Sequence, residues 1–533
     1  MAGKTLVVGG DGRYFNRVAV SVILKMAAAN GVAKVYVAKD GILATPAASA
    51  VIRKRQAYGG FILTASHNPG GPESDWGIKW NGSNGGPASE AVTAAIYAKT
   101  QSIAQYKIAA HVTWPSVDLG VTGKTKIDQF EVEVIDSADD YVTLLKSVFD
   151  FEMLKTFVAR PEFSCVFDAM NAVTGPYAKA ILVDELGADP SSVIRSDPLE
   201  DFGGIHPDPN LTYAPELVKL MKYGQDDSSG APQFGAASDG DGDRNMILGK
   251  GFFVSPSDSV AIIAANHGAI PYFKGGLKGV ARSMPTSGAL DRVATALGIE
   301  CYETPTGWKF FGTLMDADKC SICGEESFGT GGDHVREKDG IWAILAWLSI
   351  LASKNQDEAA SFVGVADISK DHWATYGRNY YMRYDYEDVD GEKAKQLMAK
   401  LVASFGSQIG KSYGAFTIAT ADEFSYTDPV SADVTEHQGI RFMAADGSRF
   451  VFRLSGTGST ANATVRLYME KYQAPKAALV EGEEAAEAAE AVEGEEDPLL
   501  LQTADALKDV ASAALEISGL QALLGVDQPT VIT

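Results

Sequence analysis

Residues 61–71 read Phe-Ile-Leu-Thr-Ala-Ser-His-Asn-Pro-Gly-Gly, an apolar run that ends in a loop of turn-forming residues. The apolar part predicts a buried β-strand, which places the loop at a strand's carboxyl end, where open α/β sheets bind ligands. Side chains of adjacent residues such as Ser66 and His67 rarely face each other, and no Gly-x-Ser-x-Gly motif surrounds Ser66. We interpret Ser66 as a phosphate-accepting hydroxyl, and the octapeptide taken alone fits a capped turn equally well.

Short β-rich and helical runs alternate around this loop, as is typical of α/β domains. The runs lie at 5–8, 17–29, 34–38 and 47–56, and the alternation returns at 164–186 and 279–303. After about residue 370 the pattern changes to aromatic strands with one helix at 392–405. We therefore expect an α/β protein with three serial α/β domains with mixed sheets, plus a carboxyl-terminal α+β domain, around a central cleft.

The composition limits the partners of the chain. Its 533 residues are enough for three or four domains, and the net charge of -23 argues against nucleic acid or an anionic membrane as the main partner. Residues 1–10 have no signal-peptide core, so we expect a cytoplasmic protein. Four cysteines, two of them in a Cys-x-x-Cys spacing, are too few for a disulfide scaffold, and we expect reduced thiols. Glycine, at 54 residues, indicates many tight loops close to a ligand.

Residues 477–497 stand apart from the rest of the chain. They contain nine acidic residues and no basic residue, among Ala, Val, Leu and Gly. Such a composition cannot bury a core, so we interpret the segment as a solvated acidic insertion in a loop and assign no chemistry to it.

A second loop, Ser-Asp-Gly-Asp-Gly-Asp-Arg at 238–244, follows an apolar run at 234–237. Carboxylates at alternate positions can direct three oxygens at one hard cation such as Mg²⁺. An EF-hand is excluded because Arg244 and Lys250 occupy the positions of its required Gly and Glu. We expect a metal site here, in preference to a solvated turn, with Arg244 as a phosphate ligand beside it.

Two more glycine-rich loops carry polar side chains. Residues 323–334, followed by Lys338, combine carboxylates with a hydroxyl, as sugar recognition requires. Residues 453–459, Arg-Leu-Ser-Gly-Thr-Gly-Ser, with Arg466 beyond, suit an oxyanion cradle. Neither this loop nor 406–412 matches a P-loop.

Taken together, the four loops resemble those of the phosphohexomutases, and within them eukaryotic-type phosphoglucomutase. The matching segments, in chain order, are 64–71, 239–244, 324–327 and 453–458. The resemblance extends over almost the whole chain, and the Gly-Glu-Glu-Ser form at 324–327 is similar to that of the glucose branch. It implies interconversion of glucose 1-phosphate and glucose 6-phosphate through glucose 1,6-bisphosphate, by a monomeric enzyme of carbohydrate metabolism that binds small sugar phosphates, with no nucleic-acid or membrane partner.

The resemblance also implies the role of each site residue. Ser66 carries the phosphoryl group, Lys79 is the general acid/base with its pKa lowered by Arg244 and the metal, and His67 supports it. Asp239, Asp241 and Asp243 bind one Mg²⁺ together with phosphorylated Ser66. The residues implied to read the sugar are Thr306, Gly307, Trp308, Lys309, Glu325, Ser327 and Lys338. Those implied to form the distal phosphate cradle are Arg453, Ser455, Gly456, Thr457 and Arg466.

We place the domains at 1–137 with the serine loop, 138–268 with the metal loop, 269–356 with the sugar loop and 357–533 with the phosphate cradle. The resembling family begins with a further strand and helix carrying an arginine loop, whereas Leu6 comes almost at once here. We expect either a truncated gene model or a first domain that lacks an edge, with lower stability and rate. Arg466 lies one residue further from Gly458 than the family pattern has it. A non-catalytic scaffold and a mutase with broader sugar preference remain as alternatives.

Overall fold

The computed structural model of the chain describes residues 1–112, 117–455, 462–475 and 497–533. The chain forms two compact units: unit 1 comprises Met1–Ala281 and Gly307–Asp367, and unit 2 comprises Arg282–Thr306 and Ile368–Thr533. Gly456 and Thr457 of the expected phosphate cradle, and 477–496 of the acidic insertion, lie outside the described residues. Unit 1 and unit 2 are described in turn.

The first part of unit 1 is built on a six-stranded mixed sheet with the strand order β4-β3-β1-β2-β6-β5. Strand β1 pairs in parallel with β2 and β3, whereas β3 pairs antiparallel with β4. Because β1 and β3 are parallel neighbours, the loops after them meet at one edge of the sheet. The elements are β1 (Thr5–Gly10), α1 (Asn16–Ala29), β2 (Lys34–Ile42), α2 (Thr45–Lys54), β3 (Gly59–Leu63), β4 (Ile78–Gly82), α3 (Glu90–Ser102), β5 (Gly123–Ile127), β6 (Phe130–Ile135) and α4 (Ser137–Val148).

The second part of unit 1 has a five-stranded mixed sheet in the order β11-β10-β9-β7-β8. Strand β9 pairs in parallel with β7 and antiparallel with β10, so the β9–β10 connection turns back sharply. The elements are α5 (Phe151–Val158), β7 (Cys165–Asp168), α6 (Thr174–Ala178), η1 (Lys179–Glu185), η2 (Pro190–Ser192), β8 (Val193–Ile194), η3 (Phe202–Gly204), α7 (Pro215–Leu220), β9 (Phe234–Ser238), β10 (Asn245–Gly249), β11 (Phe252–Val254) and α8 (Pro256–Ala265).

The remainder of unit 1 contains an antiparallel pair of strands and a buried helix. Strands β14 (Ile322–Gly324) and β15 (Thr330–Gly332) enclose the loop 325–329. Helix α11 (Gly340–Lys354) is buried over almost all of its length, and the side chain of Asp339 caps its first turn by accepting a hydrogen bond from Trp342 N at 3.0 Å. The other elements are η4 (His267–Ala269), η5 (Pro271–Phe273) and α10 (Trp308–Asp316), while β12 (Val280–Ser283) and α12 (Val365–Tyr376) cross the unit boundary.

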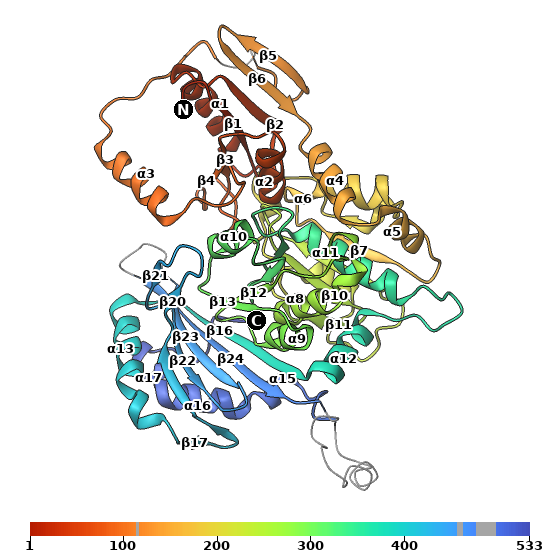
Figure 1. Cartoon of the computed structure of the whole chain (residues 1–533), viewed down its shortest axis with the longest axis vertical. Helices are drawn as coiled ribbons and strands as arrows, with labels where there is room; N and C mark the ends of the chain where they lie inside the picture. The colour runs from red at the N-terminus through yellow and green to blue at the C-terminus, as the bar shows by residue number, and fades with distance from the viewer. Residues whose placement is uncertain (113–116, 456–461, 476–496) are drawn as a thin grey trace. The chain divides into compact units, whose positions relative to one another are not determined.

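Unit 2 contains a six-stranded antiparallel sheet with helices on one face (Figure 1), in the order β19-β22-β23-β24-β16-β25. Its core lies between the sheet and helices α13 and α16, where Leu401, Phe450, Leu467 and Val510 are buried. The expected α+β character of this region is confirmed. Its elements are α9 (Ala289–Leu297), β13 (Cys301–Thr304), β16 (Arg378–Asp390), α13 (Gly391–Gln408), β17 (Ser412–Tyr413), β18 (Phe416–Thr417), β19 (Thr420–Glu423), β20 (Tyr426–Thr427), β21 (Val434–Thr435), β22 (Ile440–Met443), β23 (Arg449–Ser455), β24 (Asn462–Gln473), α15 (Thr503–Ala506), α16 (Lys508–Ser518), α17 (Leu520–Leu524) and β25 (Val531–Ile532).

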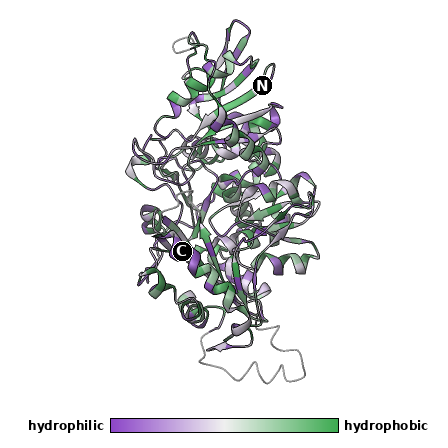
Figure 2. Ribbon diagram, turned by 90° about the vertical axis from the view of Figure 1, so that its left-hand side faces the viewer, coloured by the Kyte–Doolittle hydropathy of each residue, from purple (hydrophilic) through white to green (hydrophobic). Residues whose placement is uncertain are grey.

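Hydropathy follows this architecture. In Figure 2 hydrophobic residues run along the strands, and hydrophilic residues are spread over the outer loops and helices. All four cysteines are free thiols, as expected for reduced residues, and Cys320 and Cys323 are fully buried. Among the residues that the structure describes, none of the helices combines the length and the apolar character needed to cross a membrane.

Candidate active site

Ser66 lies three residues after the end of β3, as the sequence predicts. Its φ of 55° is in the left-handed region, which is uncommon for a residue with a side chain. The Ser66 hydroxyl donates a hydrogen bond to Asp239 Oδ2 at 3.2 Å. The contact joins the loops that follow β3 and β9, 173 residues apart in the sequence, and so brings two of the predicted motifs together.

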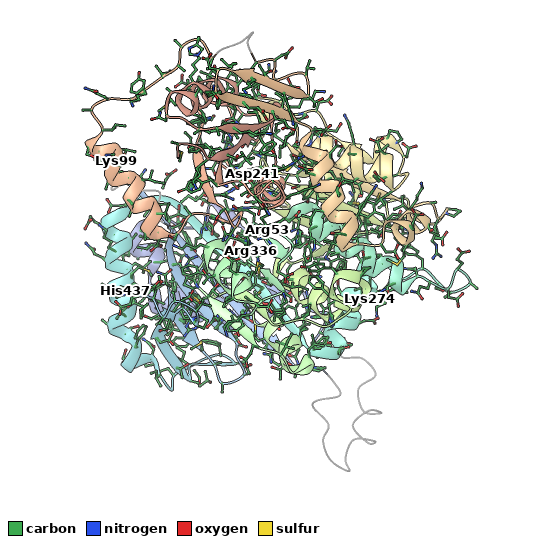
Figure 3. The ribbon with its side chains drawn as sticks, turned by 45° about the horizontal axis from the view of Figure 1, so that its top comes forward. Arg53, Lys99, Asp241, Lys274, Arg336 and His437 are labelled. Carbon is green, nitrogen blue, oxygen red and sulfur yellow. The ribbon has the colours of Figure 1, made fainter. Side chains whose placement is uncertain are left out.

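The three aspartates of the second loop form one buried cluster at the β9–β10 turn. Oxygens of Asp239, Asp241 and Asp243 lie within 4.8 Å of one another, and Asp241, which is labelled in Figure 3, is fully buried. Asp239 Oδ1 accepts hydrogen bonds from the N–H groups of Asp243 at 2.9 Å and Arg244 at 3.0 Å. Burial, followed by the charges of Asp243 and Asp241, raises the pKa of Asp239 well above its usual value. The cluster therefore concentrates negative charge that a cation would neutralise.

A glycine allows the two loops to approach each other. A Cβ atom on Gly240 would lie 2.4 Å from the Ser66 carbonyl oxygen, a distance at which either loop would have to shift. The glycine-rich composition of the 238–244 loop thus has a steric reason at this position, because only glycine lets its backbone pack against Ser66.

Two lysines lie beside the aspartates. Lys79 Nζ lies 2.9 Å from Asp241 Oδ2, and Lys338 Nζ lies 3.3 Å from Asp243 Oδ1. Burial alone would lower the pKa of Lys79, but Asp241, Asp243 and Glu337 outweigh it and raise that pKa. Among the protein groups alone the pKa of Lys79 is thus raised, opposite to the direction expected from Arg244, because the nearest charges are carboxylates.

Arg244 and His67 complete this part of the site. Arg244 Nη1 lies 3.2 Å from Asp208 Oδ1, and its Nε atom is buried with no hydrogen-bond partner in the described part of the chain. Burial, and then the positive charges of Arg244 and Lys338, lower the pKa of His67 well below its usual value. A neutral His67 ring can donate from one nitrogen and accept at the other.

The predicted sugar loop lies between β14 and β15. Glu325 Oε1 accepts a hydrogen bond from Gly307 N at 3.1 Å, and burial raises the pKa of Glu325. Ser327 is half-buried, and Trp308 is buried at the start of α10. Lys309 makes an ion pair with Glu90 at the start of α3, and Thr306 belongs to unit 2. The structure thus brings Gly307 and Glu325 of the predicted sugar-reading set together. The described ion pair of Lys309 is to the exposed Glu90, which is not one of the predicted site residues.

Unit 2 carries the two arginines of the predicted phosphate cradle. Arg453 on β23 and Arg466 on β24 are directly paired across the antiparallel ladder, and Ser455 is paired with Thr464. Arg453 Nη1 lies 3.3 Å from Tyr468 Oη, and Arg466 Nε lies 3.6 Å from Asp385 Oδ2. Residues directly opposite each other in a ladder project from the same face of the sheet, so a dianion at this face would pair with both guanidinium groups.

Several polar residues of this site were not anticipated from the sequence. Thr45 Oγ1 donates to Asp241 Oδ2 at 2.8 Å, and Glu337 Oε1 accepts from Asn81 Nδ2 at 2.8 Å. Arg13 lies in the loop after β1 and donates to Ser66 O at 2.8 Å. Only Arg13 had a usable signal in the sequence, because Asp-Gly-Arg at 11–13 directly follows the apolar strand β1.

Comparison with known proteins decides the family. The models for phosphoglucomutase/phosphomannomutase α/β/α domains I, II and III match residues 1–107, 139–251 and 256–376, and the model for the phosphoglucomutase-1 C-terminal domain matches 378–492. The chain belongs to the phosphoglucomutase/phosphomannomutase family. These matches confirm the predicted fold class of three α/β domains followed by a distinct carboxyl-terminal domain.

The similar proteins described next are named as phosphoglucomutases. The chain is 57% identical over 536 residues to phosphoglucomutase 1, chloroplastic, of Marchantia polymorpha, covering 100% of this chain and 78% of that protein. It is 55% identical over 553 residues to the probable phosphoglucomutase, cytoplasmic 1, of Arabidopsis thaliana, covering 100% and 91%. The open-form crystal structure of the exocytosis-sensitive phosphoprotein pp63/parafusin, a phosphoglucomutase from Paramecium, matches with a TM-score of 0.89 and 47% identity, covering 100% and 90%. The chain is therefore an enzyme of the phosphoglucomutase type, an isomerase of carbohydrate metabolism.

Proposed function

We propose that the chain interconverts α-D-glucose 1-phosphate and glucose 6-phosphate through phosphorylated Ser66 and a glucose 1,6-bisphosphate intermediate. The observation that carries this proposal is the 3.2 Å hydrogen bond from Ser66 Oγ to Asp239 Oδ2. It joins the serine hydroxyl to a buried cluster of three carboxylates with Lys79 and Lys338 alongside. The identity of 55–57% to phosphoglucomutases over the full chain supports glucose as the sugar.

We assign one Mg²⁺ to Asp239, Asp241 and Asp243, with an oxygen of phosphorylated Ser66 as a further ligand. Asp241 Oδ1 is buried without a hydrogen-bond partner among the described residues, and Asp243 Oδ1 has only the ion pair with Lys338 Nζ at 3.3 Å. Asp241 Oδ1 therefore has an unused lone pair for a cation, and Asp243 Oδ1 would share its charge between the cation and Lys338. Magnesium prefers carboxylate and phosphate oxygens, which this donor set supplies. Bound there, Mg²⁺ would neutralise charge on the oxygens of the transferring phosphoryl group.

In the first transfer the bond between phosphorus and Ser66 Oγ breaks, and a bond from phosphorus to O6 of glucose 1-phosphate forms. The O6 hydroxyl loses a proton and Ser66 Oγ gains one, and we assign this exchange to Lys79 with His67 as a supporting contact. The raised pKa of Lys79 keeps it protonated at rest, so it donates to Ser66 Oγ as that bond breaks and then, as the neutral amine, takes the proton from O6. Arg244 stabilises the phosphoryl oxygens as a bidentate donor.

In the second transfer the reoriented bisphosphate returns its C1 phosphate to Ser66 and leaves glucose 6-phosphate. One serine serves both hydroxyls, so the phosphate that is not reacting must be held at a second place. We assign that role to Arg453, Ser455, Gly456, Thr457 and Arg466, a role that the pairing of Arg453 with Arg466 across β23 and β24 supports. The sugar is read by Thr306, Gly307, Trp308, Lys309, Glu325, Ser327 and Lys338.

The remaining proposals concern organisation and location. We keep the domain boundaries at 137, 268 and 356, and expect a monomer. A cytoplasmic location is supported by the 55% identity to a cytoplasmic relative from Arabidopsis, although chloroplastic relatives are equally similar. Imaging of the full-length protein fused to a fluorescent protein in its own cells tests the location, and sedimentation equilibrium tests the monomer.

A coupled assay for glucose 6-phosphate tests the function. We expect turnover of glucose 1-phosphate that requires Mg²⁺, is stimulated by glucose 1,6-bisphosphate and is lost in Ser66→Ala. Ser74→Ala, which removes a hydroxyl from the same loop region at a more exposed position, is the matched control and should retain activity. A non-catalytic scaffold predicts no turnover by folded and phosphorylated protein, and that result would overturn the proposal. Equal kcat/KM for mannose 1-phosphate would instead support the broader mutase.

A further inference from the structure

The left-handed conformation of Ser66 is held by a set of buried side chains outside the four predicted loops. The Arg13 side chain is only 1% exposed, and Arg13 itself lies beyond the carboxyl end of β1. Its Nη2 atom donates to the carbonyl oxygens of Ser66 at 2.8 Å and Asn68 at 3.2 Å. Its Nη1 atom donates to those of Asp75 at 2.8 Å and Pro69 at 3.4 Å. One guanidinium thus gathers four backbone carbonyls of the serine loop.

The backbone N–H of Ser66 is held from the same side. It donates to Thr64 Oγ1 at 2.7 Å, and the Thr64 hydroxyl in turn donates to Asp11 Oδ2 at 2.6 Å. Asp11 Oδ2 also accepts from Arg13 Nε at 2.8 Å, and the Asp11 side chain is completely buried. The two peptide groups that flank Ser66 Cα are therefore both tied, through short chains of hydrogen bonds, to the Asp11–Arg13 pair.

These contacts fix the dihedral angles that decide where Ser66 Oγ points. A non-glycine residue keeps a positive φ only when its surroundings over-determine it. Phosphoryl transfer depends mainly on alignment of the attacking and leaving oxygens, so a small displacement of Ser66 would slow the reaction without removing any group that touches substrate. A clamp that only stabilised the fold would not need to hold both peptide groups of the phosphorylated residue.

We propose that Asp11, Arg13 and Thr64 form a positioning clamp that holds Ser66 in line for both phosphoryl transfers. The clamp rests on the proposed function, because it acts only through Ser66. No described hydrogen bond or ion pair joins its three residues to the aspartate cluster. Their side chains contact the backbone of the serine loop and one another, and in addition Asp11 Oδ1 accepts from Asn16 Nδ2 at 3.1 Å and the Arg13 guanidinium lies over the Phe202 ring. The clamp is expected to affect the rate of transfer and not the affinity for sugar phosphate.

The main test compares Thr64→Val with Thr64→Ser. Valine keeps the shape of threonine but removes the hydroxyl that holds Ser66 N, whereas serine restores the hydroxyl. We expect Thr64→Val to lower kcat by about ten- to a hundredfold with KM for glucose 1-phosphate changed by less than about twofold, and Thr64→Ser to recover most of the rate. Thr64→Ala removes the same hydroxyl without branching at Cβ, and it replaces the valine variant if that variant does not fold.

A second arm separates positioning from general stability. Arg13→Lys keeps the charge but loses the planar fork, and Arg282→Lys is its matched control in unit 2, where Arg282 is also buried and donates to carboxylates and to backbone carbonyls. Both variants are expected to melt at lower temperature. Only Arg13→Lys should slow single-turnover transfer from the phosphorylated enzyme to glucose 1-phosphate. The transfer is measured by intact-protein mass spectrometry as loss of the phosphoryl mass.

The outcomes separate the clamp from the proposed function. Turnover by Ser66→Ala would overturn the proposed function, and the clamp with it. Inactive Ser66→Ala together with a wild-type kcat in folded Thr64→Val or Thr64→Ala would overturn the clamp alone. Thr64→Ser that fails to recover the rate, or Arg282→Lys that slows transfer as much as Arg13→Lys, would also overturn it.

Discussion

Glu303 on β13 is the centre of the densest ion-pair network described in unit 2. Its carboxylate lies 2.9 Å from Arg282 Nη1, 2.9 Å from Arg441 Nη1 and 3.3 Å from Arg449 Nη1. The three arginines come from β12, β22 and β23, so this one side chain ties the segment Arg282–Thr306 to the carboxyl-terminal sheet. Glu303→Gln removes the negative charge while keeping nearly the same shape, and it leaves the three arginines without this shared partner.

The size of the effect follows from the pKa of Glu303. Burial by itself would raise that pKa, but Arg282, Arg449 and Arg441 outweigh burial and lower it from 4.5 to about 2. At about 1.4 kcal/mol per pH unit, the ionised carboxylate stabilises unit 2 by roughly 3 kcal/mol. Because the folded-state pKa is the lower one, this contribution is complete above pH 4.5 and is lost as the pH falls toward 2.

Hydrogen exchange measured by mass spectrometry gives the free energy of opening for peptides from β22 and β23. We expect Glu303→Gln to lower it by about 3 kcal/mol at pH 7, and the difference from wild type to shrink below about pH 4.5. The control is Glu392→Gln, which removes an exposed ion pair with Lys395 worth less than about 0.5 kcal/mol. A loss no larger than that of the control, or a loss that does not change with pH, would refute this account of the network.

Two further predictions concern unit 1. A saturating concentration of Mg²⁺, about a hundredfold above its dissociation constant, should stabilise the folded protein by about 2.7 kcal/mol and raise its melting temperature. Asp243→Asn should remove most of this rise, whereas the control Asp227→Asn, at an exposed aspartate, should keep it. An equal rise in both variants would contradict the assigned site. Burial raises the pKa of Glu337 from 4.5 to about 8, so the folded protein retains a proton that the unfolded chain releases, and wild type loses stability as the pH rises from 4.5 to 8. Glu337→Gln does not titrate, so its melting temperature relative to wild type should increase over that range; a constant difference would show that Glu337 is ionised in the folded protein.

Much of the architecture could be predicted from local patterns. The alternation of β-rich and helical runs gave β1, α1, β2 and α2 to within a few residues, because each of these runs shows its own period. The positions of Ser66 and of the three aspartates after β3 and β9 also followed from the sequence, since an apolar strand followed by glycine and polar residues predicts a loop at the strand's carboxyl end.

The partners of those loops could not be predicted in the same way. Thr45 and Asp241 are 196 residues apart in the sequence, and Asp208 and Arg244 are 36 residues apart, yet the side chains of each pair are in hydrogen-bond contact. Nothing in the local sequence distinguishes Thr45 from any other helix-starting threonine. The direction in which protein groups shift the Lys79 pKa could not be predicted for the same reason: it depends on which charges surround the ammonium group in space, and those of Asp241 and Asp243 are the largest.

The sequence by itself determined which chemical groups the protein carries: a serine loop, a carboxylate loop, a glycine-rich loop with glutamates and a serine, and two arginines, each recognisable from residues that are close together in the chain. The tertiary structure decided how these groups act on one another. It places Ser66 Oγ against Asp239, surrounds Lys79 with carboxylates, and closes Arg13 over the backbone of the serine loop. The physical reason is that a motif is a local property of the chain, whereas alignment and pKa depend on distances between residues that only folding brings together.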